Sequence, residues 1–323
     1  MAIALNPSLG CATLSPFKIF HRSRRRTTHV QGKISKIHYP RNTRELLALL
    51  GKGRGRVAPV GGGVSFSFSV PPKVSELASM RALGLDGITL DRKGLHLGAL
   101  VTIAGLASSP RAARFMGGLL AGAAARVAAT TNRNLITVGG NAVRLFIWSD
   151  LPVVYCAADA RFMVRGAKGA RRLAAEQFYK TQPLTWLRCS EFIEEITIPA
   201  PGPRAGAAYE KFCETENTFA LVSAAACVTL DRAGKCASAR LALGGLRLLP
   251  RMSEKAAETL RGESPSPARL RDAAAAAVGE AKAVRDIRVT ADYKRELATV
   301  VARRALEKAF AAAGAQRSGE SHA

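Results

Sequence analysis

The chain has 323 residues, of which 48% are hydrophobic and 22% are charged, so it can hold two domains and is too apolar to be disordered as a whole. No apolar run is long enough to span a membrane. The 48 Lys and Arg against 24 Asp and Glu give a formal net charge of +24, which attracts acidic partners at long range and says nothing about the fold.

The cysteines and histidines show no metal-binding pattern. The six cysteines form no C-x-x-C pair and no short cluster with histidines, which argues against an iron–sulfur or zinc site in this chain. The five histidines are scattered and unpaired, and none is given a catalytic role. Because no secretory apolar segment is visible, we expect a cytoplasmic protein with free thiols.

The first 33 residues carry six Lys and Arg and neither Asp nor Glu. This composition predicts an unpacked, disordered basic extension. An organelle transit peptide or a nucleic-acid-binding arm would have the same composition, and we assign no chemistry to this segment.

Strand and helix signals begin after this extension. Residues 34 to 39 fit a short strand, and Asn42 can cap a leucine-rich helix that the glycines at 51, 53 and 55 end. Residues 57 to 60 then form a brief apolar strand that leads into three glycines at 61 to 63. The order is strand, helix, strand and glycine loop.

The next stretch mixes antiparallel strands with helix. Residues 88 to 90 and 95 to 99 flank the turn tetrapeptide Asp-Arg-Lys-Gly, which predicts a β-hairpin. Residues 117 to 130, rich in Ala, Leu and Gly, suit a buried helix that leads to a second glycine loop at 137 to 141. Two strand-rich stretches follow, at 153 to 160 and 191 to 198.

The Pro- and Gly-rich stretch at 199 to 203 is the best domain boundary in the chain. Beyond it, residues 224 to 243 predict a second hairpin, and Ser253 can cap a helix that Gly262 ends. An alanine-rich helix after Pro267 and a terminal helix stopped by Gly314 complete the pattern. We therefore expect the basic extension over 1–33, a first domain over 34–200, a second domain over 205–314 and a tail over 315–323.

The two glycine loops are the candidate chemistry. Neither matches G-x-G-x-x-G, and the chain contains no G-x-x-x-x-G-K-[ST] phosphate loop. Glycine allows a positive φ and close backbone approach, so successive N–H groups of two such loops can hold a diphosphate; plain turn chemistry is the alternative for each loop. Thr137 and Asn141 bracket the second loop. Asp150 can bind ligand hydroxyls or act as a structural cap.

At these residues the sequence resembles the FAD-binding medium subunit of molybdenum hydroxylases, the family of xanthine dehydrogenase and carbon monoxide dehydrogenase. The resemblance runs from about Ile34 to Phe310, and Thr137-Val138-Gly139-Gly140-Asn141 is its most specific part. It implies an α+β fold: a two-subdomain FAD-binding fold of the PCMH/vanillyl-alcohol-oxidase type, then a C-terminal domain of antiparallel sheet plus helices. The cofactor contacts that it implies are Val60, Gly61, Gly62, Gly63, Val64, Ser65, Thr102, Thr137, Val138, Gly139, Gly140, Asn141, Asp150, Ile193 and Lys211.

The resemblance also implies roles for these residues. The two glycine segments would surround the pyrophosphate of FAD, and Asp150 would bind ribityl or ribose hydroxyls. Ile193 and Lys211 would lie near the isoalloxazine, where a lysine could stabilise the negative charge of reduced flavin. Gly63 and Val64 depart from the family, which commonly has hydrogen-bonding side chains at these two positions.

The function that this implies is electron transfer rather than substrate chemistry. The chain would take electrons from a small subunit with two [2Fe-2S] clusters and pass them through FAD to NAD, a quinone or oxygen. A molybdenum-pterin large subunit would act on the substrate. The alternatives are a basic nucleic-acid-binding protein, which no recognition motif supports, and a stand-alone FAD-dependent reductase, against which the C-terminal half argues.

Overall fold

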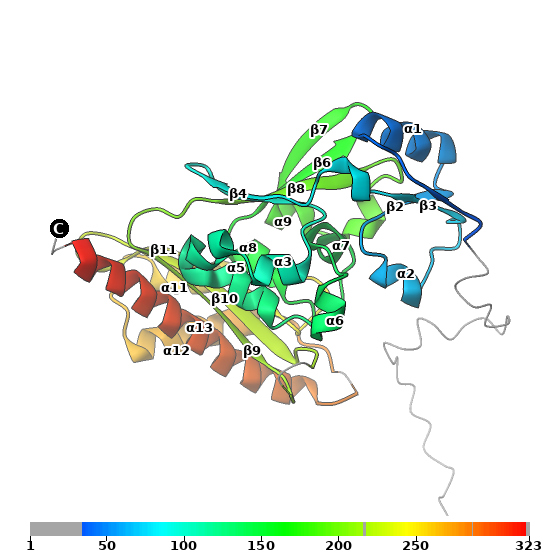
Figure 1. The fold of residues 1–323 in the computed structure, drawn as a ribbon. Coiled ribbons are helices and arrows are strands. Elements are labelled where there is room, and N and C mark those ends of the chain that lie inside the picture. Colours follow the sequence, from blue (N-terminus) through cyan, green and yellow to red (C-terminus); the bar gives the residue numbers. More distant parts are fainter. Residues whose placement is uncertain (1–33, 216–217, 286, 321–323) are drawn as a thin grey trace, which may run out of the picture.

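The computed structural model describes residues 34–215, 218–285 and 287–320, and the basic extension predicted over 1–33 lies outside the described residues. Three separate sheets organise the described chain, each with its own helices (Figure 1). One is parallel and two are antiparallel. This confirms the predicted α+β class.

The first sheet is small and parallel. It has the order β1-β3-β2, with β1 at Lys36–His38, β2 at Val57–Val60 and β3 at Glu76–Ser79. Helix α1 (Thr43–Gly53) joins β1 to β2 and buries Leu46 and Leu50 against Val57 of β2 and Ala78 of β3. As predicted, the Asn42 side chain caps α1, accepting a hydrogen bond from the Glu45 N–H.

The second sheet is antiparallel, with the order β4-β5-β8-β6-β7, and it carries the largest buried core. The predicted hairpin forms from β4 and β5, and the strand predicted over 191 to 198 is β8. The strands are β4 (Ile88–Asp91), β5 (Gly94–Gly98), β6 (Arg161–Gly166), β7 (Gly169–Ala174) and β8 (Phe192–Pro199).

Short helices connect the strands of these two sheets: α2 lies between β2 and β3, and α3 to α10 lie between β5 and β8. The chain turns at η3 (Arg81–Leu83) and η4 (Phe115–Gly118). The helices are α2 (Val64–Phe68), α3 (Ile103–Ala107), α4 (Pro110–Arg114), α5 (Leu119–Ala125), α6 (Thr130–Arg133), α7 (Val138–Val143), α8 (Leu151–Ala157), α9 (Ala175–Phe178) and α10 (Pro183–Trp186).

Two expectations about these helices were wrong. Most of the stretch predicted as strand at 153 to 160 belongs to α8, and every residue of α8 is buried. A short run of apolar residues shows the same sequence pattern in a buried helix as in a buried strand, so the pattern could not separate the two. The buried helix predicted over 117 to 130 is reduced to α5 and the start of α6. Left-handed backbone at Met116, Gly117 and Gly118 interrupts the helix before α5, and Ala128 with φ +45° interrupts it after.

The third sheet forms the second half of the chain, with the order β12-β11-β10-β9. The predicted hairpin is β10 (Val222–Leu230) with β11 (Cys236–Gly244); β9 is Ala205–Phe212 and β12 is Arg251–Met252. Ser253 caps α11 (Glu254–Leu260) as predicted, and α12 (Pro267–Glu280) follows. The terminal helix α13 (Ala291–Glu320) runs through Gly314, so the predicted stop was wrong.

This sheet lies between two sets of helices. Helices α12 and α13 lie together on one side of it (Figure 1), where small residues of β9 to β11 meet alanines of the helices. Helix α8 of the first half packs on the other side, and Arg240 of β11 donates hydrogen bonds to the carbonyls of Cys156 and Ala157. The third sheet therefore closes over the first half of the chain.

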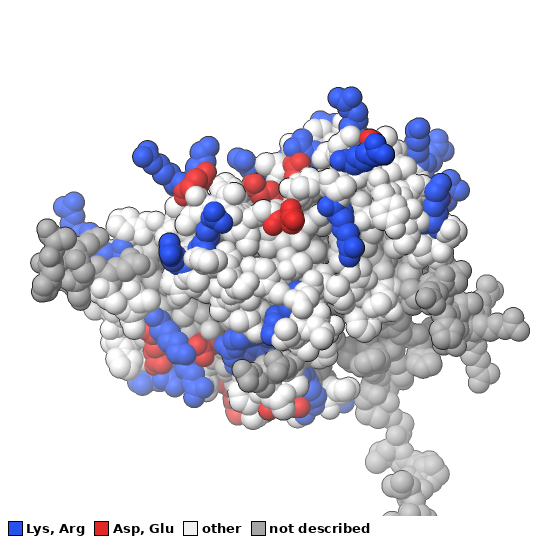
Figure 2. Space-filling model, viewed as in Figure 1, with Lys and Arg blue, Asp and Glu red and all other residues white. Residues whose placement is uncertain are grey.

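On the face drawn in Figure 2, the charged side chains are spread rather than concentrated. Figure 2 shows Lys and Arg dispersed over the visible face, with fewer Asp and Glu and a broad uncharged area between them. Within the described residues, no helix is both long and apolar enough to cross a membrane.

Candidate functional site

The first glycine segment leaves backbone donors open. It follows β2, and Gly63, with φ +80°, precedes α2 as its cap residue. In the described part of the chain, the N–H groups of Gly62, Gly63, Val64 and Ser65 donate to no protein acceptor. Four consecutive open amides at a left-handed turn form the kind of concavity that binds the oxygens of an anion.

The second glycine segment differs from the expected loop, because it is the first turn of α7. Its N–H groups are used within the chain: Val138 donates to Val101 O at 2.9 Å and Gly139 to Ala99 O at 2.9 Å. Gly140 donates to Thr137 Oγ1 at 3.2 Å, and Asn141 donates to Thr137 O. Thr137 caps α7. Its hydrogen bonds, together with those to the carbonyls of Ala99 and Val101 after β5, keep the two glycines helical despite their low helix propensity.

The two segments nevertheless meet. A Cβ atom on Gly62 would lie 1.5 Å from the Leu135 carbonyl oxygen, and one on Gly61 would lie 3.0 Å from Thr137 Oγ1. Thr137 also pairs with Thr102 in an isolated β-bridge, and Thr102 caps α3 by accepting from the Gly105 N–H. The predicted residues of the two glycine segments and Thr102 are therefore neighbours.

Asn141 lies in α7, and Ile193 lies on β8 of the second sheet. The Asn141 Oδ1 atom is buried without a hydrogen-bond partner among the described residues, so it can accept from a ligand. Ile193 is buried on β8, where it pairs with Val164 of β6 and packs in the main core.

Asp150 and Lys211 form a buried ion pair that the sequence separates by 61 residues. Lys211 Nζ lies 3.4 Å from Asp150 Oδ2 and donates to the Arg126 carbonyl at 2.9 Å. The Tyr209 hydroxyl donates a short hydrogen bond to Asp150 Oδ1. Arg126 donates to the Lys211 carbonyl at 3.0 Å, and its guanidinium lies 5.7 Å from the centre of the Tyr209 ring.

Burial controls the protonation of this cluster. It raises the pKa of Asp150, although Lys211, the Tyr209 hydrogen bond and Arg126 act in the opposite direction. It also raises the pKa of Tyr209 well above its ordinary value, and the neighbouring Asp150 adds to that increase. Tyr209 is therefore a neutral donor at physiological pH.

Arg133 fixes the loop that carries Arg126. Its Nη1 atom donates to the carbonyls of Ala125, Val127 and Ala128 at 2.7 to 3.1 Å, and its Nη2 atom donates to Thr130 Oγ1. The loop between α5 and α6 is thus held by one side chain.

Sequence reasoning did not assign Tyr209 or Arg126 to the site. Tyr209 could have been found, because residues two apart on a strand lie on the same face and Lys211 was already a candidate. No sequence signal pointed to Arg126.

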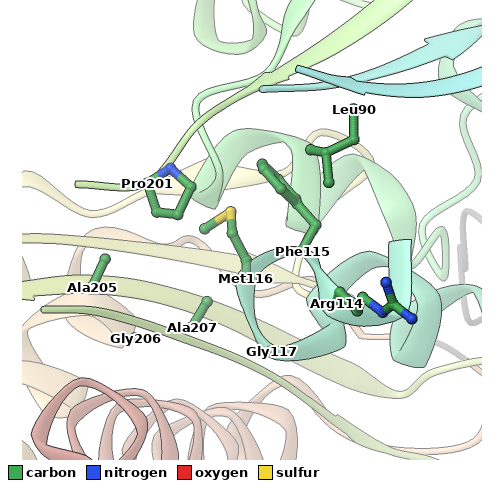
Figure 3. A pocket seen from close by; sticks show the side chains of 9 residues that line it. All are labelled: Leu90, Arg114, Phe115, Met116, Gly117, Pro201, Ala205, Gly206 and Ala207. Carbon is green, nitrogen blue, oxygen red and sulfur yellow. The ribbon is translucent and has the colours of Figure 1, made fainter. Parts of the chain in front are cut away.

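A separate cavity of about 220 Å³ lies where β4, η4 and the start of β9 meet (Figure 3). Its walls are apolar apart from Arg114, and it includes none of the predicted site residues. In the described part of the chain, no group of three or more His, Cys, Asp or Glu residues could hold a metal ion.

Two protein families match the chain. Residues 31–201 match the family described as the FAD binding domain in molybdopterin dehydrogenase, and residues 207–309 match the C-terminal domain of the CO dehydrogenase flavoprotein.

Curated relatives match over most of their length. The chain is 29% identical over 280 residues to the carbon monoxide dehydrogenase medium chain of Afipia carboxidovorans, which covers 85% of this chain and 96% of the relative. It is also 29% identical to subunit alpha of the 6-hydroxypseudooxynicotine dehydrogenase complex of Paenarthrobacter nicotinovorans, over 82% of this chain and 90% of that one.

Solved structures of carbon monoxide dehydrogenases also contain chains with this fold. Carbon monoxide dehydrogenase from Hydrogenophaga pseudoflava matches with a TM-score of 0.80 and 28% identity, over 86% of this chain and 98% of that chain. The reconstituted enzyme from Oligotropha carboxidovorans matches with a TM-score of 0.80 and 29% identity, over the same shares.

Proposed function

The chain belongs to the molybdenum hydroxylase family as an FAD-binding medium subunit, and from this premise we propose that it carries electrons from a partner's iron–sulfur clusters, through FAD, to a final acceptor. FAD supplies the redox chemistry when bound. The chain's own residues bind the cofactor, orient it and set the charge around it.

The open amides of the first glycine segment are the observation that carries this proposal. The N–H groups of Gly62, Gly63, Val64 and Ser65 have no protein acceptor among the described residues, so a phosphate can bind to them without displacing a protein bond. This fits the diphosphate of FAD, and it offsets the missing side-chain donors at Gly63 and Val64.

The second glycine segment contributes in another way. Because its N–H groups are already bonded, we assign it to the wall of the site and not to the donors. Gly140 is exposed and keeps α7 free of a side chain there, and Asn141 offers its unpartnered Oδ1 atom.

The buried pair of Asp150 and Lys211 is assigned to the flavin end. In low dielectric surroundings a fixed ammonium acts strongly on nearby charge. Lys211 stabilises an anionic form of the ring, and Asp150 holds the lysine in place.

The partners proposed are an iron–sulfur small subunit and a molybdenum-pterin large subunit. Several relatives are named as medium chains or as a subunit of a complex, which supports a multi-subunit assembly. A net charge of +24 favours partners with acidic surfaces. NAD, a quinone and oxygen are the acceptors to be compared.

The test is purification of the chain with and without co-expressed partner subunits. We expect flavin absorbance at a stoichiometry near one FAD per chain, and in the complex we expect co-elution of flavin, iron–sulfur absorbance and molybdenum. Reduction of the bound flavin by the complex, followed by reoxidation with each acceptor in turn, identifies the acceptor. A chain that binds no FAD in either preparation would refute the proposal.

A further inference from the structure

The cluster around Asp150 joins two halves of the chain. Arg126 follows the end of α5 and Asp150 precedes α8, both in the first half, whereas Tyr209 and Lys211 lie on β9 in the second half. Tyr209 and Lys211 are two residues apart on one strand and both reach Asp150. The cluster therefore exists only when β9 is docked on the first half.

The hydrogen bonds to the Asp150 carboxyl group oppose the effect of burial, which raises the pKa of this group. Asp150 accepts from the Tyr209 hydroxyl at Oδ1 and from the Lys211 ammonium at Oδ2. With a donor at each oxygen, the carboxyl group acts as an ionised acceptor. The cluster then holds the two cations Lys211 and Arg126 against one carboxylate, which leaves one net positive charge.

Each member is held by more than one contact. Lys211 is fixed between Asp150 Oδ2 and the Arg126 carbonyl. Arg126 returns a hydrogen bond to the Lys211 carbonyl and lies over the Tyr209 ring. Removing the Tyr209 hydroxyl would leave Asp150 Oδ1 buried without its donor. Because that hydrogen bond lowers the pKa of Asp150, its loss favours the neutral carboxyl group and leaves more of the positive charge of Lys211 and Arg126 uncompensated.

Resting on the proposed function, we propose that Tyr209 and Arg126 are positioning residues of the flavin site, which hold the Asp150–Lys211 pair so that one net positive charge faces the cofactor. A negatively charged reduced flavin gains more from that charge than the neutral oxidised flavin does. The cluster thereby raises the potential of the bound flavin.

The experiment measures the midpoint potential of the bound flavin in the FAD-loaded full chain. The variants are Tyr209→Phe, which keeps the ring, Arg126→Gln, which removes the charge, and Arg126→Lys, which keeps it. The matched control is Arg303→Gln, which breaks a half-buried pair with Glu307 on α13. Thermal unfolding and the affinity for oxidised FAD are measured in parallel.

We expect Arg126→Gln to lower the potential, because reduced flavin loses about tenfold more affinity than oxidised flavin. Tyr209→Phe should raise the potential, because a neutral Asp150 no longer compensates the charges of Lys211 and Arg126. Arg126→Lys should recover most of the shift, and Arg303→Gln should leave the potential unchanged. A purely structural role would weaken both forms equally and leave the potential of the loaded variants at the wild-type value, which would overturn the inference.

This outcome is distinct from failure of the proposed function, in which the wild-type chain itself would hold no flavin. If Arg126→Gln is too unstable to load, Tyr209→Phe decides alone, because it removes one oxygen atom and keeps the packing.

Discussion

The two glycine segments look alike in the sequence and differ in the structure. Both come after an apolar stretch and both lead into a helix, α2 or α7. In the first, four successive N–H groups are open among the described residues; in the second, Thr137 and the carbonyls of Ala99 and Val101 take every N–H from Val138 to Asn141.

This difference separates two uses of glycine. In the first segment, Gly63 supplies a left-handed turn that exposes donors. In the second, Gly139 permits close approach, since a Cβ atom there would lie 2.8 Å from Ala99 Cβ. A pair of glycines alone does not show whether the backbone offers hydrogen bonds or uses them.

The contact between the segments gives the largest predicted effect. In Gly62→Ala the new Cβ atom would overlap the Leu135 carbonyl oxygen, so we expect a loss of about 3 kcal/mol or more in unfolding free energy and loss of FAD. Denaturant unfolding and flavin content measure both.

Gly51→Ala is the control for this substitution, because nothing lies within 4 Å of the new Cβ atom in α1. It should gain about 0.5–1 kcal/mol in stability. Equal stability of the two variants would mean that Gly62 does not lie against the Leu135 carbonyl.

Proline at the first position of α7 tests the bonded amides. Val138→Pro removes the N–H that binds Val101 O and leaves that carbonyl without its donor, so we expect a loss of about 2 kcal/mol in unfolding free energy. Chemical denaturation measures it, and an unchanged midpoint would show that this amide is not engaged.

The matched substitution in the first segment is Val64→Pro, at the first position of α2. Proline suits the first position of a helix and no protein hydrogen bond is lost, but Gly63 before it has ψ −9°, which a following proline disfavours, so we expect a loss of about 1 kcal/mol in unfolding free energy. The FAD dissociation constant should rise about tenfold, because one donor to the phosphates is gone. Fluorescence titration with FAD measures this, and wild-type affinity would contradict a role for this amide.

The smallest effect concerns the cap of α7. Thr137→Val keeps the shape and removes the acceptor of the Gly140 N–H, so we expect a loss of about 1 kcal/mol in unfolding free energy. Thermal unfolding resolves a change of this size. Thr137→Ser, which keeps the acceptor, should retain most of the stability; similar losses in both variants would argue against the cap.

The sequence predicted strands and helix caps better than it predicted the features that depend on tertiary contacts. The strands at both hairpins and the caps at Asn42 and Ser253 were correct, because alternation and capping are local signals. The helix α7 was missed, because contacts with Ala99 and Val101 decide it. Gly314 did not end α13, because a helical glycine costs only about 1 kcal/mol relative to alanine.

The candidate site was found largely through family resemblance. The residues themselves pointed to the glycine segments and to Asp150, and only the resemblance added Lys211 to the candidates. Neither gave a means of pairing Asp150 with Lys211, because a contact between residues 61 apart depends on how β9 docks. The cofactor roles of these residues remain predictions.

The face of β9 opposite Tyr209 and Lys211 packs on α13, and this contact bears on the order in which the chain folds. Gly206 lies so close to α13 that a Cβ atom there would be 2.0 Å from the Ala309 carbonyl oxygen. Because α13 is translated after every other described element, we expect β9 to settle only once it has been made. During synthesis on the ribosome, the first glycine segment can therefore fold early. The contacts of Tyr209 and Lys211 with Asp150 form only after α13 has emerged.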